Sequence, residues 1–176
     1  MKFYMEEVKV LIEEEKIDEK VREIAKKIEE DYKGKEITLI CILKGSSFFT
    51  IDLAKRINRN VKIEFIQVSS YGSSTVGAQN IELKLDLKES IEEKDVIIVE
   101  DIIDTGRTLK FLIEHLKGRK PNSLKLCTLL DKPERRIYDV KVDYLGFEIP
   151  DKFVVGYGLD FNEMYRNLPY VGYIGE

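Results

Sequence analysis

Carboxylates cluster in the segment VIIVEDIIDTGRTL, which covers residues 96–109. Glu100 and Asp101 directly follow four branched aliphatic residues, and Asp104 comes three residues later. An unpaired carboxylate is costly to bury, so we expect Glu100 and Asp101 to stay solvated or to meet a cation or hydroxyl groups. For the pair taken alone, a solvated strand end is the favoured interpretation.

The residues after these carboxylates indicate an anion site. They are Thr105, Gly106, Arg107 and Thr108. They open a predicted helix, where hydroxyls and free backbone N–H groups can hold a phosphate with help from the helix dipole. Gly106 allows the backbone to approach closely. An anion site one loop away from a polyol or metal site suits a sugar phosphate.

Other enzyme classes fit this segment poorly. The tripeptide DTG at 104–106 also occurs in aspartic proteases, but those need two such aspartates, and this DTG leads into a predicted helix. A protease would therefore require a homodimer. The sequence also lacks the nucleotide patterns G-x-x-x-x-G-K-[ST] and G-x-G-x-x-G.

Strands and helices are predicted to alternate along the chain. Apolar runs predict strands over 37–43, 61–68, 96–100, 123–130 and 142–149. Apolar periodicity predicts a helix over 18–32, a second helix that follows KGSSFF and ends at about residue 57, and a third over 105–118. Residues 69–80 are small and polar and predict a mobile loop. This order is typical of an α/β domain with a parallel sheet.

Charged residues follow three of these strands. They are Lys44-Gly45, Glu100-Asp101 and Asp131-Lys132. Open α/β sheets bind their ligands at the carboxyl ends of the strands. We therefore expect these residues to converge on one site.

Composition excludes several classes of protein. A chain of 176 residues suggests one domain, and its net charge of −4 argues against general nucleic-acid binding. No apolar run approaches the roughly 20 residues of a membrane span, and the acidic start lacks the apolar region of a signal peptide. We therefore expect a cytoplasmic protein without a membrane partner.

The cysteines and the histidine are not expected to do chemistry. Cys41 and Cys127 each lie inside an apolar run, which predicts buried, inert thiols. His115 comes late in a predicted helix, where an interaction with the helix C-terminus is expected rather than catalysis or metal binding.

The segment VIIVEDIIDTGRTL resembles the phosphoribosyl-pyrophosphate (PRPP) signature of type I phosphoribosyltransferases. Three more stretches, LKGS at 43–46, SSYGSS at 69–74 and DKFVVGYGLDFNEMYRNLPYVG at 151–172, are similar to the 6-oxopurine branch, the hypoxanthine-guanine phosphoribosyltransferases. The resemblance implies one domain over 1–176, with a mostly parallel central sheet flanked by helices. Its core would cover about 35–150, a small hood about 1–17 and 150–176, and a flexible lid loop about 69–82.

The resemblance further implies an Mg²⁺-dependent enzyme that acts on small molecules. It would transfer the 5-phosphoribosyl group from PRPP to N9 of hypoxanthine or guanine in purine salvage, as a homodimer or tetramer. Two alternatives stay open: a non-catalytic regulator that senses PRPP or nucleotides on the same fold, and a xanthine-preferring relative. The stretch DKFVVGYGLD argues against a pyrimidine relative but does not rank the oxopurines.

Carried over residue by residue, the resemblance implies roles at the sugar-phosphate end of the site. Glu100 and Asp101 would bind the ribose hydroxyls and, directly or through water, Mg²⁺. Asp104 would be the general base that takes a proton from purine N7, and Asp160 would help to hold a second Mg²⁺ near the exocyclic position of the base. The 5′-phosphate would lie on Asp104, Thr105, Gly106, Arg107 and Thr108.

It also implies roles at the pyrophosphate and purine ends. Pyrophosphate would meet Lys44, Gly45 and Arg166, with a cis peptide bond before Lys44. The purine would meet Lys132 at its 6-oxo group, the stacked ring of Phe153 and the backbone of Val154. Ser70 and Tyr71 would belong to the lid.

Overall fold

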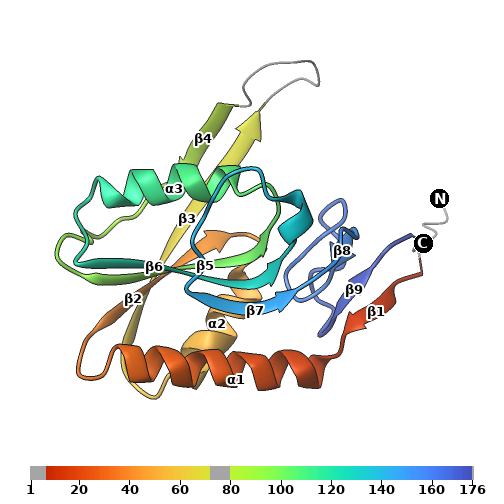
Figure 1. Ribbon diagram of the computed structural model, residues 1–176, viewed down its shortest axis with the longest axis horizontal. Helices are drawn as coiled ribbons and strands as arrows, with labels where there is room; N and C mark the ends of the chain where they lie inside the picture. Colours follow the sequence, from red (N-terminus) through yellow and green to blue (C-terminus); the bar gives the residue numbers. More distant parts are fainter. Residues whose placement is uncertain (1–6, 72–79, 176) are drawn as a thin grey trace.

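A six-stranded sheet forms the centre of the computed structural model, which describes residues 7–71 and 80–175, without the side chains of Ser70, Tyr71 and Asn80 (Figure 1). The strands are β2 (Ile37–Leu43), β3 (Val61–Tyr71), β4 (Asn80–Leu85), β5 (Asp95–Ile103), β6 (Ser123–Asp131) and β7 (Tyr144–Glu148), in the order β4-β3-β2-β5-β6-β7. All neighbouring strands are parallel except β4, which runs antiparallel to β3. The prediction of a mostly parallel sheet is confirmed.

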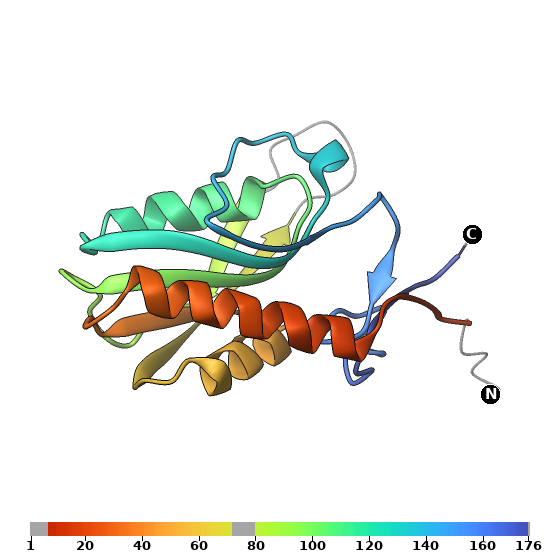
Figure 2. The same cartoon turned by 60° about the horizontal axis from the view of Figure 1, so that its bottom comes forward.

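Helices cover both faces of this sheet. Figures 1 and 2 show α1 (Glu14–Asp31) and α2 (Ser47–Arg56) on one side and α3 (Arg107–Lys117) on the other. A short 3-10 helix, η1 (Pro133–Arg135), follows β6. Each face has its own cluster of buried apolar side chains, as expected when a sheet is covered on both sides.

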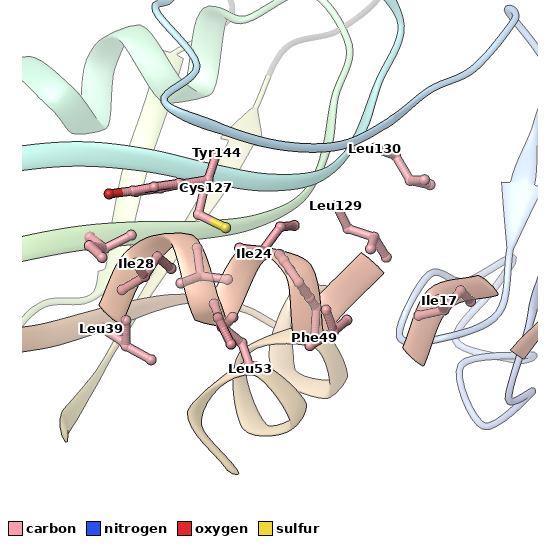
Figure 3. Packing of buried hydrophobic residues seen from close by; sticks show 14 of the residues in the cluster. Ile17, Ile24, Ile28, Leu39, Phe49, Leu53, Cys127, Leu129, Leu130 and Tyr144 are labelled. Carbon is pink, nitrogen blue, oxygen red and sulfur yellow. The ribbon is translucent and has the colours of Figure 1, made fainter. Parts of the chain in front are cut away.

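The apolar spacing of α1 explains how it packs. Its buried side chains are Ile17, Val21, Ile24, Ala25 and Ile28, which recur at intervals of three or four residues. Figure 3 shows Ile24 and Ile28 beside Leu39, Cys127 and Tyr144 of the sheet. The helix was predicted to begin at residue 18, but it begins at residue 14. The acidic residues in its first turn suit the positive end of the helix dipole, which favours the earlier start.

A second, three-stranded sheet joins the two ends of the chain. It consists of β1 (Lys9–Ile12), β9 (Val171–Tyr173) and β8 (Val154–Val155), in the order β1-β9-β8 with antiparallel pairs. It stands beside the carboxyl ends of the central strands in Figure 1. The sequence did not indicate these strands, since segments of two to four residues are too short for apolar alternation to be recognised.

The predicted loop over 69–80 is wrong at both ends. β3 extends to Tyr71, and β4 starts at Asn80 and pairs with it, with Ser70 opposite Ile81. The alternation of Ile81, Leu83 and Leu85 was an available signal for β4. Residues 72–79 of the predicted lid lie outside the described residues.

The thiols and the histidine lie as predicted. Cys41 in β2 and Cys127 in β6 are fully buried, and burial raises the pKa of both thiols, which makes them inert. His115 lies in the last turn of α3, where its Nε2 is 3.3 Å from Asp86 Oδ2. In the described part of the chain, no helix is long and apolar enough to cross a bilayer.

Substitution of Ile28 by alanine should lower the free energy of unfolding by about 2–5 kcal/mol, because it opens a cavity under α1. The side chain of Ile28 is completely buried. Urea unfolding followed by circular dichroism measures this loss. Lys26→Ala is a control on the exposed side of the same helix, and its effect should stay within about 0.5 kcal/mol. An equal loss in both variants would contradict the packing described for α1.

Candidate active site

The carboxylates Glu100 and Asp101 lie inside β5. They were predicted at the end of a strand, so this part of the prediction is wrong. β5 pairs with β6 as far as Ile103, whereas its pairing with β2 stops at Val99. The sheet therefore opens beside β5 at the level of the two acids. One neighbouring strand holds the backbone of the pair, and the side towards β2 is left for other groups.

Both carboxylates are held in an environment that disfavours their charge. Glu100 is 8% exposed, and burial, followed by the charge of Asp101, raises its pKa well above the usual range. Burial also raises the pKa of Asp101. Asp101 N–H donates to Glu100 Oε1 at 3.0 Å, and Ile102 N–H donates to Asp101 Oδ1 at 2.6 Å. These backbone donors fix the acids next to each other despite their repulsion.

The pair fits a hard cation that arrives together with a ligand. No lysine or arginine of the described residues forms an ion pair with Glu100 or Asp101. No group of three metal-ligating side chains occurs in the described ranges, so Asp160 does not complete a three-residue cluster with them. Mg²⁺ usually takes one or two protein carboxylates and completes its shell with water and substrate phosphates. Two carboxylates are therefore a sufficient donor set.

Two glycines bring neighbouring segments against this pair. A Cβ at Gly45 would lie 1.6 Å from Asp101 Oδ2, and a Cβ at Gly158 would lie 2.0 Å from the carbonyl oxygen of Gly45. The loop after β2 therefore lies between β5 and the C-terminal segment. The peptide bond between Leu43 and Lys44 is cis, as the resemblance implied.

Lys44 and Arg166 lie together on this loop and the C-terminal segment. They share the carboxylate of Glu163, with Lys44 Nζ 2.6 Å from Oε2 and Arg166 Nη2 3.1 Å from Oε1. Arg166 also donates to the carbonyl of Gly158 at 2.7 Å and lies 3.0 Å from Asp160 Oδ1. The predicted pyrophosphate residues are thus neighbours in the fold. Glu163 lies in the stretch 151–172 that carries the resemblance, but no role was predicted for it.

A pocket of about 140 Å³ lies at the start of α3. It is lined by Glu100, Ile102, Ile103, Asp104, Thr105, Gly106, Arg107, Thr108 and Leu109. Gly106 has a φ of +81°, and a Cβ there would lie 2.8 Å from the carbonyl oxygen of Tyr138. The loop therefore needs glycine, which leaves the first N–H groups of α3 beside the pocket. Predicted residues 104–108 all line it.

Asp104 is half exposed and carries an ion pair that the sequence did not indicate. Its Oδ1 accepts a hydrogen bond from Arg135 Nε at 2.9 Å. Arg135 belongs to η1 and also lies 3.7 Å from Asp151 Oδ2. Asp104 is therefore held towards the loop after β6, where Lys132 lies.

Lys132 is buried at the end of β6, and its Nζ lies 3.3 Å from Asp151 Oδ1. The neighbouring Asp131 pairs with Arg136 and does not join Lys132 in the site. Phe153 is 53% exposed, and its ring makes an edge contact with Phe161 at a centroid distance of 5.6 Å. Its exposed ring face is available to a flat ligand.

Three further predicted residues lie in strands. Val154 is buried in β8, so only its backbone can meet a ligand. Ser70 and Tyr71 belong to β3, but their side chains lie outside the described residues.

Comparisons with known proteins agree with this geometry. Residues 10–162 match the model of the phosphoribosyl transferase domain. The chain is 50% identical to hypoxanthine-guanine phosphoribosyltransferase of Staphylococcus aureus, over 93% of this chain and 91% of that protein. It is 47% identical to the bifunctional protein TilS/HprT of Listeria monocytogenes, of whose length it spans 25%.

A solved structure shows the same arrangement. The crystal structure of a hypoxanthine-guanine phosphoribosyltransferase from Bacillus anthracis superposes with a TM-score of 0.90 at 49% identity, covering 96% of this chain and 99% of that one. The family match and the structural match both cover most of the chain. This chain belongs to the phosphoribosyl transferase family.

Proposed function

We propose that this protein is a hypoxanthine-guanine phosphoribosyltransferase that makes nucleoside monophosphate from PRPP and a free 6-oxopurine in purine salvage. The observation that carries the proposal is the contact of Asp101, the neighbour of the buried Glu100, with the Lys44-Gly45 loop. It sets a polyol and cation site directly beside a cationic site. The names of the Staphylococcus and Bacillus relatives support the same reaction.

Negative charge has to be stabilised on the pyrophosphate as it leaves C1 of the ribose. Lys44 and Arg166, which lie on either side of Glu163, would bind it, and preorganised charges of this kind are a large source of rate enhancement. Glu100 and Asp101 would hold Mg²⁺, directly or through water, and Asp160 would contribute to a second ion. Bound Mg²⁺ supplies neutralisation of the leaving group.

The 5′-phosphate fits the pocket at the start of α3. Backbone N–H groups and the helix dipole favour an anion there, and residues 105–108 add two hydroxyls. Together with the carboxylates on the ribose, this fixes C1 relative to the incoming base. Positioning of two reactants in this way contributes much of the catalysis.

The purine fits between Phe153 and Lys132. Lys132 would donate to the 6-oxo group, Phe153 would stack on the ring, and the backbone of Val154 would bind its edge. Asp104 would take the proton from N7, which requires that it leave Arg135. Adenine presents a donor where Lys132 needs an acceptor, so the buried ammonium could not donate a hydrogen bond to it.

The remaining features of the proposal concern the whole chain. Residues 1–176 would act as one domain, with a core over about 35–150, a hood over about 1–17 and 150–176, and a lid that includes Ser70 and Tyr71. Closure of the lid would exclude water from PRPP. The protein would work in the cytoplasm as a homo-oligomer.

The proposed function is tested by pyrophosphate release from PRPP and Mg²⁺, with hypoxanthine, guanine, xanthine and adenine supplied separately. Turnover is expected with hypoxanthine and guanine and not with adenine, because Lys132 requires an oxo group. Folded protein that binds PRPP but releases no pyrophosphate with any base would overturn the enzyme and favour a PRPP sensor.

Substitution of Asp104 by asparagine should lower kcat by roughly 10²-fold or more, because general acid–base help is lost. PRPP binding, measured by calorimetry, should survive, since the amide keeps the shape of the side chain. Asp139→Asn is a control at an exposed position after η1, and its turnover should stay within about twofold of the parent. Unchanged turnover in D104N would remove Asp104 from the role of general base.

A further inference from the structure

The carboxylate of Glu163 occupies the space between the two cations of the proposed pyrophosphate site. One of its oxygens lies 2.6 Å from Lys44 Nζ, and the other lies 3.1 Å from Arg166 Nη2. Two oxygens of one phosphate group would contact two cations in the same way. The ion pairs also hold the pKa of Glu163 below its usual value, with Lys44 as the larger cause.

The local backbone holds Glu163 in this place. Asn162, Glu163 and Tyr165 all have positive φ angles, of 51°, 64° and 73°, a conformation that non-glycine residues seldom adopt. Glu163 N–H donates to Asp160 Oδ2 at 2.9 Å, and Phe161 and Met164 close the turn with two backbone hydrogen bonds. A strained turn that is fixed by several bonds points to a function for the residue at its tip.

Burial shows which partner can move. The side chain of Glu163 is 64% exposed, whereas that of Arg166 is 21% exposed and stays anchored to the carbonyl of Gly158 and to Asp160. Glu163 can therefore rotate into solvent without loss of the site. Lys44, which is 55% exposed, can follow the incoming anion.

We propose that Glu163 is a positioning residue that substitutes for a phosphate group in the free enzyme and is displaced when pyrophosphate or the pyrophosphate end of PRPP binds. The inference rests on the proposed function, because it assigns a further residue to the same site. In the free enzyme Glu163 keeps two like charges together, which would otherwise repel each other. During turnover it competes with pyrophosphate and so favours release of the product.

The test is calorimetric titration of Mg²⁺-pyrophosphate into the parent protein, E163Q and E134Q. Exposed ion pairs are weak, so removal of the competing carboxylate in E163Q should tighten binding by about threefold to tenfold. E134Q removes the same charge from an exposed residue of η1 at the same edge of the sheet, and its binding should stay within about twofold of the parent. The gain of E163Q should shrink as the salt concentration rises.

Equal or weaker pyrophosphate binding by E163Q would overturn the inference, as would an equal gain in E134Q. Circular dichroism of each variant establishes that it is folded, and IMP binding should be the same in all three proteins. If the parent protein releases pyrophosphate from PRPP but E163Q binds pyrophosphate no more tightly than the parent, the role of Glu163 is refuted and the proposed function stands. A parent protein that neither binds nor releases pyrophosphate refutes the proposed function as well.

Discussion

The placement of two carboxylates at consecutive positions of one strand is the constraint on which the rest of the site depends. Glu100 is buried and Asp101 is partly buried in β5, and neither has an ion-pair partner in the described part of the chain. The neighbouring segments are built around them. Position 45 must be glycine because any side chain would collide with Asp101, and position 158 must be glycine because it packs on the backbone of residue 45.

Around this pair, the other charges of the site are already neutralised by one another. Glu163 pairs with both Lys44 and Arg166, Arg135 with Asp104, and Asp151 with Lys132. The pairs Lys44–Glu163, Arg135–Asp104 and Lys132–Asp151 join segments that are separated in sequence, so these ion pairs also hold the loops in place. Under the proposed function, binding of substrates would exchange one partner for another, which costs less than exposing a bare charge in each step.

The sequence predicted the fold where residues lie in long, regular elements. The apolar runs of β2, β5 and β6 and the spacing of α1 identified the sheet and its main helix, and the carboxyl ends of the strands located Lys44, Glu100 and Lys132. Short strands such as β8, with two residues, carry too little pattern to be recognised. The length of β5 was underestimated because a run of charge after Val99 looks like a strand end, whereas pairing with β6 carries the strand on to Ile103.

Contacts between loops could not be read from the sequence at all. Glu163, Arg135 and Asp151 reach the site through backbone turns whose conformations depend on tertiary packing. The positive φ angles of residues 162, 163 and 165 fall on asparagine, glutamate and tyrosine, not on glycine, so composition gave no sign of that turn. Such residues become visible only when the distances between side chains are known.

Under the proposed function, the Glu100–Asp101 pair is retained for Mg²⁺ and PRPP at the expense of stability. Thermal unfolding of the parent protein and of D101N, each with and without Mg²⁺ and PRPP, tests this most directly. Without ligand, D101N should melt about 2–4 °C higher, since relief of the repulsion adds on the order of 1 kcal/mol. With Mg²⁺ and PRPP, the parent should gain much more than D101N. A D101N variant that melts lower without ligand and gains as much from Mg²⁺ and PRPP as the parent would contradict the account.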